Sequence, residues 1–252
     1  MRTAAWPCLL AVRASLTRSL VTEARYHDGT YLADHPDWHA ADAPWKARWI
    51  AGIISRNAIE PAHITEVGSG SGAVLENLLP LLPETLFAGC EISPQAHALA
   101  QARVQDRLAF HLRDALADGL PRQTDLVMAI DVLEHVEDCF GFTRQLTTMA
   151  EWKVLHIPLD LSVQGLLRNR SLMHARQRLG HLHYFCRDTA LAFIAECGME
   201  VVDWHYTHGA ETLPDRRLRT RLLNGPRRLL RAFDEDFSVR LLGGASMLVL
   251  AR

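Results

Sequence analysis

The sequence has few cysteines, and their spacing does not suggest a structural framework. The 252 residues include five of them, and none forms a C-x-x-C pair: Cys8, Cys90, Cys139, Cys186 and Cys197. An odd number of scattered cysteines argues against a disulfide scaffold and against a zinc site. We therefore expect a protein of the reducing cytoplasm.

Long apolar runs and an excess of basic residues are also missing. A run such as Leu126–Ile130 is far shorter than the roughly 18 residues that a membrane-spanning helix needs, so no transmembrane segment is expected. Lysine occurs only twice, and 27 basic residues against 29 acidic ones give a formal net charge of −2. This balance lacks the basic excess of a nucleic-acid-binding protein, so we expect no nucleic-acid partner.

Charge is nevertheless divided unevenly along the chain. Residues 1–159 hold 13 basic and 19 acidic residues, whereas residues 160–252 hold 14 and 10, so an anionic partner should meet the second half. Seven arginines alternate with leucines in residues 216–231, a pattern typical of amphipathic helices, with a predicted break at Asn224-Gly225-Pro226. These arginines form either a solvated basic face or a site for an acidic substrate or a membrane surface.

The order of predicted elements indicates an α/β fold. After Pro61, short apolar strands alternate with helices, which predicts a Rossmann-like, doubly wound and mostly parallel sheet. The predicted strands are 64–67, 86–92, 108–111, 126–130, 154–157, 199–206 and 246–251. We divide the chain into a tail or helix (1–25), a helical cap (26–60) and a core domain (61–252) with helical insertions near 162–180 and 212–236.

A glycine-rich loop follows the first predicted strand. Ile64–Val67 leads into Gly68-Ser69-Gly70-Ser71-Gly72, and a helix should begin near Ala73. Glycine lets the backbone turn sharply and approach a ligand closely, so we expect Gly70→Val to block the ligand's path. The same glycines also satisfy the dinucleotide-binding pattern G-x-G-x-x-G/A, so the loop alone does not distinguish NAD from another nucleotide-like cofactor.

Acidic residues at the strand ends favour a different cofactor. Glu66 lies inside the first strand, Glu91 ends the second, and Asp114-Ala115 follows the third. A carboxylate can accept hydrogen bonds from both ribose hydroxyls, which suits Glu91 to a nucleoside. With the glycine loop, these acids resemble the pattern of the class I S-adenosylmethionine-dependent methyltransferases, over about residues 26–252. The chain is most similar to a bacterial subgroup of these enzymes, of the type 11/12 kind.

This resemblance implies the fold, the activity and the cofactor site. The last two strands should form an antiparallel hairpin at the end of the sheet, which an ordinary dinucleotide-binding domain lacks. Glu66 should order the methionine part, and Asp114 and Ala115 should contact adenine. The cofactor-binding residues are predicted to be Glu66, Gly68, Ser69, Gly70, Gly72, Glu91, Ile92, Asp114, Ala115 and Asp131.

Histidines and aromatic residues supply candidates for the acceptor pocket. A histidine can remove the acceptor's proton as the new bond forms, so His135 and His181, with Asp131, are the predicted catalytic residues. The predicted substrate-binding residues are Trp38, His39, Trp45, His156 and His183. Asp131-x-x-Glu134-His135 resembles the E-x-x-E-H loop that holds a metal in some relatives, but metal-free relatives also carry it, and no metal is expected here.

The predicted function is transfer of a methyl group from S-adenosylmethionine to an oxygen or nitrogen of a small molecule, either acidic or glycan-like. One alternative is an NAD(P)-dependent oxidoreductase, which would change the absorbance of reduced nicotinamide. Another is a catalytically silent binding module with the same fold, which would bind the cofactor without turnover. The acceptor, its reacting atom and the oligomeric state stay open at this point.

Overall fold

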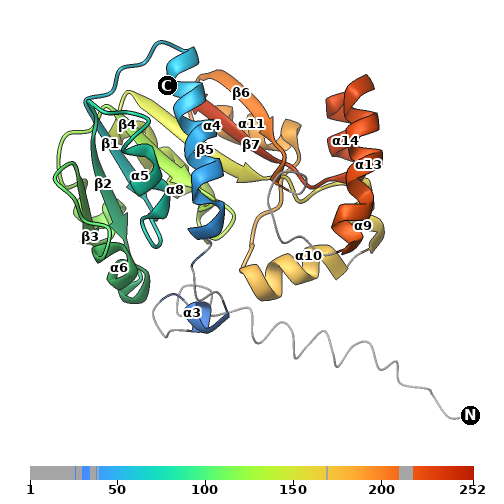
Figure 1. The fold of residues 1–252 in the computed structure, drawn as a ribbon, viewed down its shortest axis with the longest axis horizontal. Coiled ribbons are helices and arrows are strands. Elements are labelled where there is room, and N and C mark those ends of the chain that lie inside the picture. The colour runs from blue at the N-terminus through green and yellow to red at the C-terminus, as the bar shows by residue number, and fades with distance from the viewer. Residues whose placement is uncertain (1–25, 27–29, 35–37, 39, 169, 210–217) are drawn as a thin grey trace, which may run out of the picture.

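A seven-stranded sheet runs through the middle of the molecule in the order β3-β2-β1-β4-β5-β7-β6. The computed structural model describes residues 26, 30–34, 38, 40–168, 170–209 and 218–252 (Figure 1). The predicted tail (1–25), His39 and residues 212–217 lie outside the described residues. The strands are β1 (His63–Val67), β2 (Leu86–Glu91), β3 (Leu108–Leu112), β4 (Leu126–Ile130), β5 (Trp152–Pro158), β6 (Val201–Thr207) and β7 (Ser246–Ala251).

Strands β1 to β5 pair in parallel, and both pairings of β7 are antiparallel. β1 lies between β2 and β4, with Ile64 beside both Phe87 and Leu126. β7 is inserted between β5 and β6 and runs antiparallel to both. This order confirms the predicted doubly wound sheet with an antiparallel hairpin at its end.

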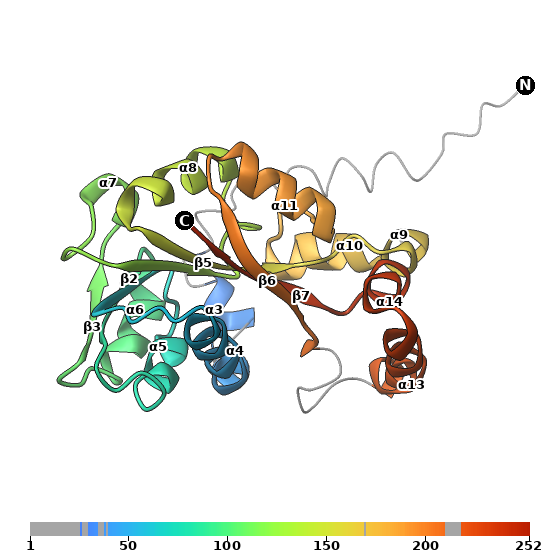
Figure 2. The ribbon, with the colours of Figure 1, turned by 90° about the horizontal axis from the view of Figure 1, so that it is seen from above.

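Helices cover both faces of the sheet, as Figure 2 shows. On one face, α4 (Ala43–Arg56), α5 (Ala73–Leu78) and α6 (Pro94–Gln101) pack against β1, β2 and β4. On the other, α8 (Cys139–Met149) and α11 (Arg187–Glu196) pack against β4, β5 and β7. The isoleucines of α4 recur at helical spacing and are fully buried, which explains why this segment folds onto the sheet.

Shorter helices complete the chain. They are α3 (Thr30–Asp34), η1 (Ala40–Asp42), α7 (Ala115–Asp118), α9 (Val163–Arg168), α10 (Arg170–His174), the π-helical turn η2 (Ala175–Leu179), α13 (Leu218–Phe233) and α14 (Glu235–Leu242). Among the described residues, no helix is both long enough and apolar enough to cross a bilayer.

The predicted break at Asn224-Gly225-Pro226 is wrong, because α13 continues through Pro226. Proline removes one hydrogen bond of the helix. Contacts with α14 hold the following turn in place: the Arg227 carbonyl accepts from the Ser238 hydroxyl at 3.1 Å, and the Arg227 guanidinium donates to the Gly243 carbonyl at 3.1 Å.

Candidate functional site

Two adjoining cavities open where the parallel strands end. The first, the Glu91 cavity, has a volume of about 380 Å³ and includes Ile92, Asp114 and Ala115 in its wall. The second, the Glu134 cavity, has a volume of about 330 Å³ and is lined by charged and polar side chains together with the glycine loop. Both cavities share five lining residues, which mark their junction: Tyr31, Trp38, Gly68, Asp131 and His135.

The glycine loop adopts a backbone that requires glycine. Gly68, Gly70 and Gly72 have φ angles of 74°, 54° and 77°, a region that other residues rarely adopt. A Cβ atom at Gly70 would lie 2.7 Å from the indole of Trp38. A larger side chain at Gly70 would therefore collide first with Trp38, the aromatic residue that covers the loop.

Two backbone amides orient the carboxylate of Glu91. Its oxygens accept hydrogen bonds from the amide of Gly70 at 2.7 Å and from that of Ser93 at 2.8 Å. Each carboxylate oxygen has a second lone pair for a ligand. Asp114 caps α7 by accepting from the amides of Leu116 and Ala117 through one oxygen, and it also lines the Glu91 cavity.

Glu66 is a buried acid that faces the Glu134 cavity. Its side chain is 2% exposed, and one carboxylate oxygen has no hydrogen-bond partner among the described residues. Burial raises the pKa of Glu66 to about 8, although Lys46 opposes this effect. A cationic ligand group in this cavity would satisfy the unpaired oxygen, so Glu66 fits the ammonium of an amino-acid moiety.

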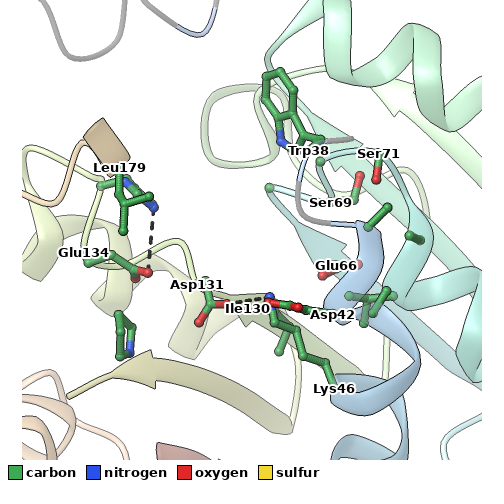
Figure 3. A pocket seen from close by; sticks show the side chains of 18 of the residues that line it. Trp38, Asp42, Lys46, Glu66, Ser69, Ser71, Ile130, Asp131, Glu134 and Leu179 are labelled. Carbon is green, nitrogen blue, oxygen red and sulfur yellow. Dashed lines mark ion pairs between the residues drawn. The ribbon is translucent and has the colours of Figure 1, made fainter. Parts of the chain in front are cut away.

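Asp131 is held by Lys46 and His156 at the junction of the cavities. Its carboxylate lies 2.7 Å from the Lys46 ammonium (Figure 3). It also lies 2.5 Å from Nδ1 of His156. Burial works against ionisation, but His156 and Lys46 hold the pKa of Asp131 well below its usual range. The residue also has a φ of 53°, a strained conformation that aspartate tolerates better than most side chains.

The same chain of contacts reaches the edge of the sheet. Nε2 of His156 lies 2.8 Å from the hydroxyl of Thr207 at the end of β6. Burial alone would lower the pKa of Lys46, yet the ion pair with Asp131 raises it. Helix α4 is therefore linked through Lys46 to the ends of β4, β5 and β6.

A second polar cluster lies across the cavity from the glycine loop. Figure 3 shows Glu134 and Leu179 on the side opposite Glu66, Ser69 and Ser71. Glu134 is 1% exposed, and one of its oxygens has no partner among the described residues. Burial raises the pKa of Glu134 well above its usual range, and the negative charge of Asp131 adds to this effect.

His181 belongs to this cluster and is oriented by an acid. Its Nδ1 lies 2.6 Å from the carboxylate of Asp160, which follows β5. A carboxylate only accepts hydrogen bonds, so Nδ1 carries the proton and Nε2 is the nitrogen able to take another. Ligand atoms of Glu134, His135 and His181 lie within 4.8 Å of one another, close enough to hold a cation.

The structure brings most of the predicted site residues together, but not all of them. Among the predicted substrate residues, Trp38 lines both cavities, and His39 lies outside the described residues. His156 lies in β5 and is 3% exposed, while His183 makes a 2.8 Å contact with the Val136 carbonyl. Trp45 lies edge-on to His156, with ring centres 6.2 Å apart, and none of His156, His183 and Trp45 is among the lining residues of either cavity.

Sequence reasoning did not select Lys46, Tyr31 and Asp160. Lys46 is one of two lysines in the chain, and its position in an otherwise apolar and arginine-containing helix was an available signal. Asp160 comes directly after the fifth strand, where the sheet ends. Tyr31 packs on Trp38 with ring centres 4.8 Å apart, a contact that no local pattern predicts.

Comparisons with known proteins agree with this geometry. Residues 65–151 match a family described as a methyltransferase domain. No curated protein matches the chain. Among solved structures, magnesium protoporphyrin IX methyltransferase from Synechocystis, with bound S-adenosylhomocysteine, superposes with a TM-score of 0.56 at 15% identity over 82% of each chain.

Two further solved structures have the same fold. A S-adenosylmethionine-dependent methyltransferase from Thiobacillus denitrificans has a TM-score of 0.58 at 14% identity, over 89% of this chain and 96% of that one. A S-adenosylmethionine-dependent methyltransferase from Geobacter sulfurreducens has a TM-score of 0.58 at 16% identity, with the same coverage of 89% and 96%. Residues 65–151 therefore match a methyltransferase domain, and the chain has the fold of S-adenosylmethionine-dependent methyltransferases.

Proposed function

We propose that this chain is a class I S-adenosylmethionine-dependent methyltransferase, which transfers a methyl group to an oxygen or nitrogen atom of a small, hydroxyl-bearing molecule such as a sugar or glycan intermediate. The observation that carries the proposal is the junction between the two cavities, where Gly68, Asp131 and His135 line both. An acceptor in the Glu134 cavity would meet the cofactor at this junction. Rate would come mainly from holding the two reactants in line.

In this proposal the Glu91 cavity takes the nucleoside of S-adenosylmethionine. Glu91, already oriented by two amides, accepts from the ribose hydroxyls, and Asp114 and Ala115 contact adenine. Glu66 accepts from the ammonium of the methionine moiety, which supplies the partner that its buried oxygen lacks. The aromatic rings of Tyr31 and Trp38 cover the junction from the N-terminal segment.

The lining of the Glu134 cavity bears on the class of acceptor. Among its described lining residues, the acids Asp42, Glu66, Asp131 and Glu134 outnumber the Lys and Arg side chains, and Lys46 already pairs with Asp131. A carboxylate or phosphate group would meet few cations here. Of the acidic and glycan-like acceptors expected from the sequence, this lining favours the uncharged, hydroxyl-bearing one.

His181 is the proposed base. S-adenosylmethionine supplies, when bound, an electrophilic methyl group on its sulfonium. Nε2 of His181 takes the proton from the acceptor while the acceptor's lone pair forms the new bond to carbon. Asp160 holds the imidazole in the required tautomer, and Asp131 stays ionised between Lys46 and His156 and positions the loop.

A reducing cytoplasm is the proposed location. All four cysteines in the described part of the chain are free thiols, three of them buried. Free thiols at these four positions suit that compartment.

The proposal is tested by supplying S-adenosylmethionine with a deuterated methyl group together with a cellular extract. We expect mass spectra to show that a small hydroxyl-bearing metabolite gains the labelled methyl group. The Glu91→Ala variant should not transfer it. Labelling only of carboxylates, or only of molecules without hydroxyl groups, would contradict the proposed acceptor class. Cofactor binding by calorimetry without any labelled product would identify a silent binding module instead.

A further inference from the structure

Large apolar side chains are exposed on three helices at one end of the molecule. Leu167 on α9 and Phe233 on α13 are each 83% exposed, and Leu229 on α13 is 64% exposed. Leu166 on α9 and Phe237 on α14 are also more than half exposed. Single exposed apolar residues are ordinary, but a group on adjoining helices indicates an interaction surface.

The orientation of α13 places two of its apolar residues, Leu229 and Phe233, on the outside. Arg227 is buried and donates to the carbonyls of Leu242 and Gly243 at the end of α14, at 3.1 Å each. Leu229 and Phe233 are four residues apart and lie on the side of the helix opposite Arg227. Leu229 and Phe233 are therefore turned away from α14.

Helices α9 and α14 meet, so the three helices form one surface, here called the α9–α13–α14 end. Gly243, which follows α14, lies against Ser162, which precedes α9, and a Cβ atom at Gly243 would be 2.7 Å from the Ser162 hydroxyl. Figures 1 and 2 both show α9, α13 and α14 gathered at the same end of the molecule.

Most of the helices at this end carry positive charge. Residues 162–180 contain four arginines and α13 contains five, and neither stretch contains an acid. Three acids begin α14, but each is engaged: Asp234 accepts from the Phe237 amide, Glu235 pairs with His208, and Asp236 pairs with Arg240. Exposed leucine and phenylalanine side chains among arginines match the interface of an anionic bilayer.

We propose that the α9–α13–α14 end docks on the surface of an anionic lipid bilayer. Leu167, Leu229 and Phe233 enter the boundary between headgroups and acyl chains, and the net positive charge of residues 162–180 and α13 attracts the anionic lipid headgroups. The segment from α9 through η2 ends at Leu179, which lines the Glu134 cavity. Docking therefore places that cavity near the bilayer surface. The inference rests on this surface and stands whether or not the proposed acceptor is correct.

The test is co-sedimentation of the full chain with vesicles. We expect binding to vesicles of phosphatidylcholine with phosphatidylglycerol, weaker binding at high salt, and little binding to phosphatidylcholine alone. The double variant Leu167→Ser/Phe233→Ser should reduce the bound fraction at least tenfold, because two inserted side chains lose their apolar contact. The matched control Leu81→Ser/Val104→Ser changes two exposed apolar residues elsewhere and should bind like the wild type.

Unchanged binding of S-adenosylmethionine by the double variant would show that it is folded. Absence of vesicle binding, equal binding to neutral and anionic vesicles, or wild-type binding by the double variant would each overturn the proposal. Sedimentation velocity without lipid tests whether a second copy of the chain binds this surface instead. If the wild type is a dimer and Leu167→Ser/Phe233→Ser is a monomer, the surface is a dimer interface, and the proposal is overturned.

Discussion

Individual side chains in the two cavities have tasks that separate variants can distinguish. Glu91 is the sharpest case, because its two oxygens are fixed by backbone amides and need no rearrangement to accept a ligand. Glu91→Ala should weaken binding of S-adenosylmethionine by about 1.5–3 kcal/mol, the usual range for hydrogen bonds to a charged group. Calorimetry measures this loss, with the exposed Glu84→Ala as control. Equal affinities of both variants would remove Glu91 from the site.

Glu66 predicts a dependence of stability on pH. Its pKa is raised to about 8 in the folded protein, whereas an unfolded chain has the ordinary value, so between these two pH values the folded state binds the extra proton. The Glu66 contribution to the free energy of unfolding should therefore fall as pH rises through this window, by a few kcal/mol. Urea titrations from about pH 5 to about pH 8, the window between the two pKa values, measure the free energy of unfolding of the wild type and of Glu66→Gln. If this free energy depends on pH equally in both proteins, the raised pKa of Glu66 is contradicted.

His181 and Asp160 predict a defect confined to turnover. His181→Ala should lower kcat by about 10²–10⁴ and leave the affinity for S-adenosylmethionine nearly unchanged. Added imidazole should restore part of the activity of that variant, since a free base can enter the vacated space. Asp160→Asn should lower kcat less and should not respond to imidazole, because the ring is present but misoriented.

Two outcomes would show that His181 is not the catalytic base. Wild-type kcat in His181→Ala would leave proximity as the mechanism. A chelator should not affect turnover, because the proposed base needs no ion. Loss of activity with chelator, restored by Mg²⁺, would instead give Glu134, His135 and His181 the role of metal ligands.

At the scale of whole elements, the N-terminal segment contributes two tryptophans with different surroundings. Trp38 lies on the glycine loop and lines both cavities, whereas Trp45 on α4 lies beside His156 away from the cavity walls. Trp38→Ala should weaken cofactor binding with little change in stability. Trp45 is half-buried, so Trp45→Ala should lower the free energy of unfolding by less than the about 3–5 kcal/mol of a fully buried aromatic residue and leave affinity unchanged.

Thermal unfolding and calorimetry on the same two variants separate these effects. The reverse pattern, in which Trp45→Ala loses affinity and Trp38→Ala does not, would mean that α4 forms the cavity wall and the Trp38 contact with Gly70 is incidental.

Local patterns in the sequence predicted most of the sheet and only part of the site. Leu126–Ile130 and Ser246–Ala251 were predicted with their observed bounds, because a fully apolar run between turn residues leaves little choice of element. The continuity of α13 was missed, since Arg227 is held by carbonyls of a later helix. The Lys46–Asp131 pair joins residues 85 positions apart in sequence, and only tertiary packing brings them together.

For the whole molecule, the antiparallel hairpin predicts a marked asymmetry between the two ends of the sequence. Removal of residues 1–20 should leave S-adenosylmethionine binding intact, because the described lining residues of both cavities begin at Tyr26. Removal of residues 246–252 takes away β7, and with it the partner of both β5 and β6. Gel filtration should show soluble monodisperse protein for the first variant and aggregate for the second. A soluble second variant would mean that β7 is not needed to complete the core.

The position of β7 also orders events during synthesis. The first five strands can pair with one another as they leave the ribosome, since each has its neighbour among residues 63–158. Strand β6 emerges next, but its described neighbour in the sheet is β7 alone. The ribosome must add about 40 more residues before β7 begins to emerge. During that interval β6 and the outer edge of β5 are open to other nascent chains. Slow codons between residues 207 and 246 would lengthen this exposure, so the yield of folded enzyme should depend on how quickly that stretch is translated.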